Sequence, residues 1–221
     1  MAVVLLVRHG QASFDGPDYD LLSAVGEEQS RLVGRRLTQI GPVHRVVHGS
    51  LRRQRQTAEQ CLEVLGNDLP CEVDERWDEY DTGDVFGPLP ADETLAEAAD
   101  PRRAFQARLE EGLERWTSGE HDADYDEPYR DFHTRSRAAL DQVLGDIGRS
   151  ETVAVFTSGG VIAAVCAQWL NADGAGWASL NRVMVNSSIT KLVHGRSGTN
   201  LLTVNDHAHL EGRPRELLTY R

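Results

Sequence analysis

Two short segments of this chain, residues 3–7 and residues 152–157, are rich in apolar and β-branched residues, and the segments between them show shorter or periodic patterns. Runs of this length that are rich in β-branched residues are typical of strands buried on both faces of a parallel sheet. Each run ends at polar residues and glycine, Arg8-His9-Gly10 after the first and Ser158-Gly159-Gly160 after the second. The pattern therefore predicts two central strands, each followed by a polar turn.

Apolar residues at helical spacing predict the helices. Ser23 is a suitable N-cap for the first helix, which Gly41-Pro42 ends. The predicted helices span residues 24–40, 51–65, 103–116, 129–147 and 161–170. Short β-branched segments predict two further strands, at residues 45–48 and 71–73.

Two segments near the end of the sequence, 188–194 and 200–204, flank the turn Gly195-Arg196-Ser197-Gly198 and predict a β-hairpin. If the first strand of this hairpin runs antiparallel to the central strands, the second runs parallel to them. The loop 205–209 then lies at the same end of the sheet as His9.

Residues 78–129 differ from the rest of the chain, because they are acidic, rich in loops and interrupted by proline. We expect a cap subdomain here, inserted over the sheet, in which Trp77, Tyr80 and Phe86 are candidates for contacting a substrate. The prediction is a single α/β domain over residues 1–221. It is a three-layer sandwich with a mostly parallel central sheet, helices on both faces and a cap at about 78–129.

Length, charge and cysteine content restrict the possible functions. A chain of 221 residues with 40% hydrophobic content supports one sizeable core. Its net charge of −12 argues against a nucleic-acid partner or an anionic membrane surface, since both require basic patches. The 3 cysteines lack zinc spacing, and the sequence pattern indicates neither export nor a membrane span. We expect a cytoplasmic protein with free thiols, whose oligomeric state the sequence does not determine.

The turn Arg8-His9-Gly10 is the first candidate site. A histidine just past a central parallel strand lies where open α/β sheets bind ligands, and the neighbouring arginine suits an anion. An ordinary strand end that faces water is an equally good explanation of this tripeptide alone. Residues 51–58 are the second candidate, because arginines at a helix start favour phosphate, although a solvated basic helix start is the simpler alternative. Cations at this end oppose the helix dipole, so we expect a negative group to compensate them.

Together these two segments resemble the histidine phosphatase superfamily, which contains the phosphoglycerate mutases and many phosphatases. The second motif of that family reads approximately Ser-x-Leu-x-Arg-Ala-x-Gln-Thr-Ala. Gly49 and Gln54 depart from this motif, and five positions match it: Leu51, Arg53, Gln56, Thr57 and Ala58.

Residues 74–83 look like the acid segment of the family, Asp-Glu-x-x-x-Glu-x-x-x-Gly, which puts Glu79 in the role of proton donor. On the residues alone, a glutamate among so many carboxylates is better explained as a surface charge. We expect neighbouring carboxylates to keep its pKa raised, as a general acid requires.

The turn after the second central strand departs from the family, whose members usually have Ser-His-Gly-Gly there. Ser158 stands in place of the second active-site histidine, while Gly159 and the helix start retain backbone donors for a phosphate. The loop 11–15 also departs from the mutases, which have Glu-Ser or Glu-Thr after the glycine and an asparagine at the position of Asp15.

The remaining candidates are weaker. Gly10, Ser13, His48 and His207 are possible pocket residues. His207 and His209 alternate after a strand, but no third ligand has suitable spacing, so we expect no metal site.

The resemblance implies that neutral His9 attacks a phosphate monoester, that Arg8 and Arg53 hold the phosphoryl oxygens, and that Glu79 protonates the leaving alcohol. Water would then hydrolyse the phosphohistidine, and neither a cofactor nor a metal is implied. The first hypothesis is a histidine acid phosphatase-type enzyme that acts on a small phosphorylated substrate, slowly because of Ser158. A mutase is second, and a catalytically impaired phosphate-binding or regulatory protein is third.

Overall fold

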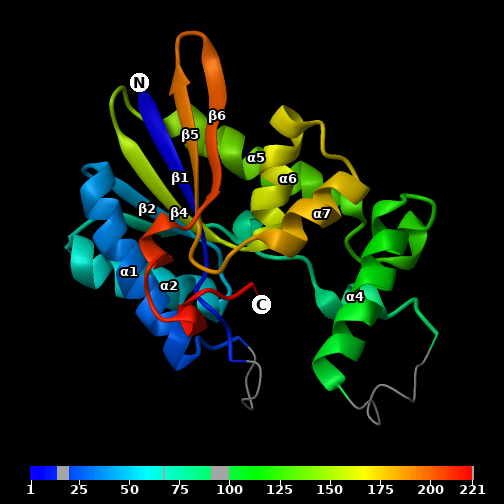
Figure 1. Ribbon diagram of the computed structural model, residues 1–221. Coiled ribbons are helices and arrows are strands. Elements are labelled where there is room, and N and C mark those ends of the chain that lie inside the picture. Colours follow the sequence, from blue (N-terminus) through cyan, green and yellow to red (C-terminus); the bar gives the residue numbers. More distant parts are fainter. Residues whose placement is uncertain (14–19, 67, 91–99, 221) are drawn as a thin grey trace.

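The fold is built on one mixed sheet, shown in Figure 1 in a computed structural model that describes residues 1–13, 20–66, 68–90 and 100–220. The strand order is β3-β2-β4-β1-β5-β6, with β1 parallel to β4, β4 to β2, and β2 to β3. Strand β5 is antiparallel to β1 and to β6, as the predicted hairpin requires. The strands are β1 Ala2–Arg8, β2 Arg45–His48, β3 Cys71–Val73, β4 Thr152–Thr157, β5 Ile189–Gly195 and β6 Gly198–Asp206.

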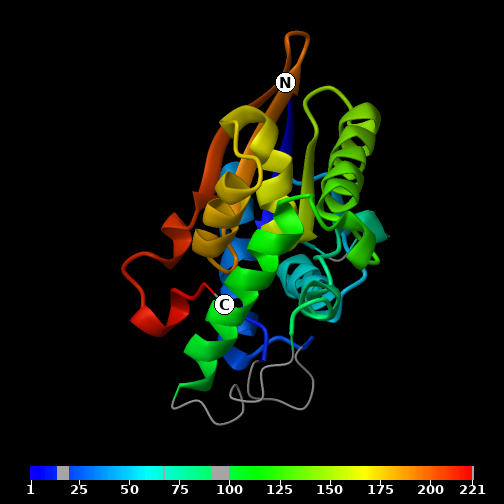
Figure 2. The ribbon, with the colours of Figure 1, turned by 90° about the vertical axis from the view of Figure 1, so that its right-hand side faces the viewer.

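Helices cover both faces of this sheet, and the alternation of side chains along β1 shows which face each helix covers (Figures 1 and 2). Leu5 and Val7 pack with residues of helices α1 and α2, whereas Val4 and Leu6 pack with residues of α5 and α6. The predicted three-layer α/β fold is thereby confirmed. These helices are α1 Ala24–Ile40, α2 Arg52–Leu65, α5 Tyr129–Asp146 and α6 Gly159–Leu170. No helix in the described part of the chain is both long and apolar enough to cross a bilayer.

The segment predicted as a cap contains helices α3, Thr82–Phe86, and α4, Pro101–Thr117. Helix α4 stands to one side of the sandwich in Figure 1 and contacts α7, Ala175–Val183. Trp116 of α4 lies 5.3 Å from the ring of Tyr80 and 5.7 Å from that of Trp177. Trp77 and Tyr80 are therefore buried in the main core, which argues against the expectation that they contact a substrate.

Two short helices were not predicted. Helix α3 has five residues and begins after Asp81, whose carboxylate accepts from Gly83 N (2.7 Å). Helix α7 follows Gly174, which has a positive φ of 47°, and its buried contacts come chiefly from Trp177. Both are too short for an apolar repeat to be recognised in the sequence. Helix α6 also begins earlier than predicted, at Gly159 rather than Val161.

The loop between β1 and α1 is pressed against the first turn of α1. A Cβ atom at Gly10 would lie 2.4 Å from Gly26 O, and one at Gly26 would lie 2.2 Å from Gln11 O. Both contacts are with backbone atoms, which cannot move aside independently. Glycine at these two positions therefore allows the chain after β1 to approach the helix.

We expect Gly10→Ala to lower the free energy of unfolding by about 1–3 kcal/mol, because the methyl group overpacks a backbone contact. The change is measured by urea denaturation followed by circular dichroism. Gly145→Ala is the matched control, because nothing lies within 4 Å of a Cβ there and alanine is the better helix former. Equal stability of Gly10→Ala and the parent would contradict the close approach.

Candidate active site

The turns that follow β1, β2 and β4 lie side by side at the carboxyl edge of the sheet. The N–H of His9 donates to Thr157 O (2.9 Å), and the N–H of Gly49 donates to Phe156 O (3.2 Å). These strands are parallel neighbours, so polar residues that follow them meet at one place. The two sequence motifs and the Ser158 turn are thus brought together.

The contacts of His9 select one tautomer of its ring. Nδ1 lies 2.7 Å from Gly10 O, which can only accept, so Nδ1 carries the proton. Nε2 accepts from Nε of Arg53 (3.2 Å), so it is unprotonated. Both bonds fit a neutral imidazole whose Nε2 lone pair is directed at the arginine. This is the form that a nucleophile requires.

The surroundings of His9 favour this neutral form. Burial, followed by the positive charges of Arg53 and Arg8, lowers the pKa of His9 well below its usual value. The bond to Gly10 O acts in the opposite direction but is the smallest of these effects. These effects together favour the neutral form of His9.

Arg8 is held at the end of β1 by carbonyl groups from distant segments. Its Nη1 donates to Met184 O and to Tyr220 O (2.6 Å). A Cβ atom at Gly159 would lie 3.3 Å from its Nε, so the guanidinium also faces the first turn of α6. The predicted phosphate-binding residues Arg8 and Gly159 are therefore neighbours.

Arg53 is paired with an acidic residue from the loop that precedes α1. Its Nη1 lies 2.5 Å from Asp20, whose other oxygen accepts from Arg52 N (2.8 Å). The carboxylate of Asp78 accepts from Ser50 N (2.6 Å), just ahead of the same helix. The expected negative compensation at this helix start is thereby confirmed.

Glu79 lies on the N-terminus of α6. Its Oε2 accepts from Gly160 N (3.0 Å), and a Cβ atom at Gly160 would lie 2.3 Å from Oε1. Burial raises the pKa of Glu79, while the bond from Gly160 and the charges of Arg53 and Arg8 oppose the rise. The direction agrees with a general acid, but the cause is burial rather than the neighbouring carboxylates that we expected. The backbone donor of Gly160, predicted for a phosphate, is bonded to this carboxylate.

Ser158 is fully buried at the start of α6, and its hydroxyl makes no capping bond to the helix. Its Oγ instead accepts from Nε2 of Gln54 (2.8 Å), which also donates to Trp77 O (3.0 Å). Gln54 is itself fully buried. Apart from its departure from the family motif, no feature of the sequence pattern singles out Gln54.

Arg135 of α5 holds the backbone of the acid segment and was also missed. Its Nη1 donates to Arg76 O (2.9 Å) and to Asp78 O (2.7 Å), and its Nη2 donates to Glu79 O (3.4 Å). The same guanidinium pairs with both carboxylate oxygens of Glu127 (2.5 and 2.9 Å). An arginine in the middle of a predicted helix carries no signal of such a role in the sequence.

Two residues that match the family motif bind the loop after β1 and have no direct contact with the His9 side chain among the hydrogen bonds of the described residues. The hydroxyl of Thr57 accepts from Gly10 N (3.0 Å), and the amide oxygen of Gln56 accepts from Leu22 N (2.9 Å). Helix α2 thus positions the loop that carries His9.

Of the weaker candidates, Gly10 contacts His9 through its carbonyl oxygen, whereas the other three form hydrogen bonds within their own segments. Ser13 N donates to Leu21 O (2.7 Å), His48 Nδ1 lies 2.6 Å from Gly49 O, and His207 Nδ1 lies 2.7 Å from Asn205 O. Phe14 and Asp15, which bear on the mutase hypothesis, lie outside the described residues. Within the described ranges, no group of three or more His, Cys, Asp or Glu side chains could hold a metal ion.

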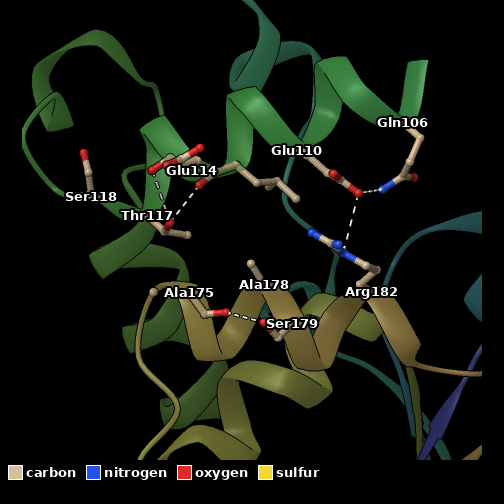
Figure 3. Close-up of a pocket in the computed structure, with 11 residues that line it drawn as sticks. Gln106, Glu110, Glu114, Thr117, Ser118, Ala175, Ala178, Ser179 and Arg182 are labelled. Atoms are coloured by element: carbon tan, nitrogen blue, oxygen red, sulfur yellow. Dashed lines mark hydrogen bonds and ion pairs between the residues drawn. The ribbon is translucent and has the colours of Figure 1, made fainter. Parts of the chain in front are cut away.

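A separate cavity of about 450 Å³ lies between α4 and α7 (Figure 3). Glu110 and Arg182 form an ion pair within it (3.5 Å). Its lining contains none of the predicted site residues, so it is distinct from the site around His9.

Comparison with protein families matches residues 4–207 to the histidine phosphatase superfamily, branch 1. The chain belongs to this family. Among curated proteins, no sequence matches it significantly.

Several solved structures are similar to this protein over nearly the whole chain. A mycobacterial glucosyl-3-phosphoglycerate phosphatase, solved with inorganic phosphate, is 27% identical, with a TM-score of 0.64 and coverage of 94% of this chain and 98% of its own. YhfR of Bacillus stearothermophilus is 19% identical, with a TM-score of 0.71 and coverage of 96% and 100%. Phosphoserine phosphatase of Entamoeba histolytica is 16% identical, with a TM-score of 0.66 and coverage of 95% and 100%. The last two show that the fold is shared.

We expect Arg53→Gln to raise the pKa of His9, because the substitution removes a positive charge beside Nε2. The pKa is measured by NMR titration of the imidazole resonances, assigned with a His9→Gln variant. Arg55→Gln is the matched control on the same helix, since Arg55 is exposed and pairs with Glu59 (3.6 Å). A His9 pKa that is unchanged or lower in Arg53→Gln would show that the guanidinium does not act on this ring.

Proposed function

We propose that this protein is a phosphatase that hydrolyses small phosphate monoesters through a phosphohistidine on His9. The observation that carries the proposal is the neutral His9 ring, with Nδ1–H bonded to Gly10 O and the Nε2 lone pair beside Arg53. A phosphoryl group at that point would meet two guanidinium groups, that of the buried Arg8 and that of the partly buried Arg53, which neutralise its charge.

In the first step, Nε2 of His9 attacks phosphorus, and the bond from phosphorus to the ester oxygen breaks. The leaving oxygen takes the proton of Glu79. Burial raises the pKa of this carboxyl, so it keeps its proton to a higher pH than an exposed glutamate does. The phosphorylated ring retains its proton on Nδ1 and is positively charged, which weakens the new P–N bond.

In the second step, water attacks phosphorus and gives a proton to the Glu79 carboxylate. The P–N bond breaks, its electron pair returns to Nε2, and inorganic phosphate leaves. Both residues regain their starting protonation states, so the cycle closes without a cofactor or a metal.

Family membership is compatible with both a phosphatase and a mutase, whereas the similar mycobacterial phosphatase, which was also solved with VO3, favours the phosphatase. A phosphate-binding protein with little turnover is the second candidate, because Ser158 is a neutral residue at the position of the second imidazole. Turnover and the trapped intermediate distinguish the two.

We expect rapid mixing with p-nitrophenyl phosphate, followed by quenching in alkali, to trap phosphate on His9, because phosphohistidine survives at high pH. The modified residue is identified by mass spectrometry of peptides. The label should be absent from His9→Ala and retained in His121→Ala, an exposed histidine outside the site. Phosphate on a serine or on another histidine would contradict the assignment.

We expect Glu79→Gln to slow hydrolysis of an alkyl phosphate by about 100-fold or more and that of 2,4-dinitrophenyl phosphate much less, because only the poor leaving group needs a proton. The measurement is kcat for both substrates. Glu75→Gln is the matched control, an exposed carboxylate in the same segment. An equal loss for both substrates would remove Glu79 from the role of acid.

A further inference from the structure

Three of the departures from the family motifs, Gly49, Gln54 and Ser158, are connected through Gln54, although Ser158 lies far from the other two in the sequence. Nε2 of Gln54 donates to Ser158 Oγ (2.8 Å). A Cβ atom at Gly49 would lie 2.0 Å from Oε1 of Gln54. A serine at position 49, as in the family motif, is therefore incompatible with this position of the glutamine. The departures form one connected change in the site.

Both amide hydrogens of Gln54 are used, since Nε2 also donates to Trp77 O (3.0 Å). These two bonds fix the plane of the amide. Ser158 Oγ acts as the acceptor in its bond with Gln54, so the hydroxyl proton is not needed there. The N–H groups at the helix start are donors and cannot accept this proton, and Ser158 makes no capping bond to them. The proton can therefore be donated elsewhere.

The unsatisfied amide oxygen of Gln54 indicates that this residue has a role other than stabilising the fold. Oε1 is buried and has no hydrogen-bond partner among the described residues. Leaving a buried acceptor unsatisfied is unfavourable, and an alanine, as in the family motif, would avoid it. The glutamine is explained if its Nε2 bonds serve the site.

We propose that Gln54 and Ser158 act as a pair in place of the second imidazole. Gln54 is a positioning residue that fixes the Ser158 hydroxyl, and Ser158 donates to an oxygen of the transferring phosphoryl group. The inference rests on the proposed function for its substrate. It explains why one substitution at the site is accompanied by two others.

The proposed pair predicts how substitutions of Ser158 and Gln54 change kcat and KM. Ser158→Ala removes a donor to the transferring group, which lowers kcat by about 100–1000-fold with little change in KM. Gln54→Met keeps the approximate length of the side chain but removes both N–H bonds, so it lowers kcat without unfolding the protein. The double variant Gln54→Met/Ser158→Ala is no slower than Ser158→Ala, because the positioned group is already gone.

The experiment measures kcat and KM for p-nitrophenyl phosphate, orthovanadate affinity by calorimetry, and melting temperature across this cycle. Gln60→Met is the matched control, the same substitution on the same helix at a residue outside the site. Coupled losses in kcat and in vanadate affinity, at unchanged melting temperature, support the pair. Independent, multiplying losses, or no loss in Ser158→Ala, overturn it.

Vanadate separates the inference from the proposed function. If the parent protein lacks turnover but the vanadate affinities are coupled, the phosphatase proposal fails and the pair stands. If the parent turns over substrate but the variants are not coupled, the pair fails and the phosphatase stands. A parent that neither binds vanadate nor turns over substrate overturns both.

Introducing a histidine at position 158 gives a second, independent test of the pair. Ser158 is fully buried against Gln54, so Ser158→His alone overpacks the site and lowers kcat. Adding Gln54→Ala makes room for the ring, and kcat of the double variant should exceed that of Ser158→His at least about tenfold, the gain expected when a donor is restored. A faster enzyme from Ser158→His alone would show that Gln54 does not occupy this space.

Discussion

Buried positive charge beside a neutral imidazole is the constraint on which the site depends. Arg8 is 7% exposed, and the side chain of Arg53 is 11% exposed. A guanidinium that loses this much water needs acceptors, and the strands that carry the site do not supply enough of them. The acceptors come from Met184, Tyr220 and Asp20, which lie far from these arginines in the sequence. Satisfying two charges therefore draws the end of α7, the C-terminal segment and the loop before α1 to the sheet edge.

One environment produces the two opposite pKa shifts that phosphoryl transfer needs. Burial favours the neutral form of any titratable group, so it lowers the pKa of His9 and raises that of Glu79. The arginine charges reinforce the shift of the histidine and oppose that of the glutamate. Burial is the largest effect on Glu79, so both residues tend toward their neutral forms. A neutral base and a neutral acid are the pair required to begin the reaction.

The sequence predicted what local patterns determine. The strands β1 and β4, the C-terminal hairpin and the helix start at Arg52 all follow from apolar runs, turn residues and periodicity, and their parallel order brings His9, Arg53 and Ser158 together. Family spacing, rather than any local pattern, pointed to Glu79.

Contacts between distant segments could not be predicted in this way. The clamp of Arg135 on the acid segment and the bond of Tyr220 O to Arg8 depend on tertiary packing that no spacing records. The same holds for Gln54 and Ser158, which were each recognised as departures but not as neighbours.

Three donor groups at the site are bonded to acceptors of the protein itself. Arg53 bonds to Asp20, Arg8 to Tyr220 O, and Gly160 N–H to Glu79. A phosphate that takes over these donors replaces the acceptors, so its binding energy is the difference between two sets of charge-assisted bonds. A neutral ligand would exchange a carboxylate for a weaker acceptor and gain nothing. A dianion gains most, because it brings more charge to both arginines than one carboxylate and one carbonyl do. The acceptors already present thus favour the phosphoryl group over neutral ligands.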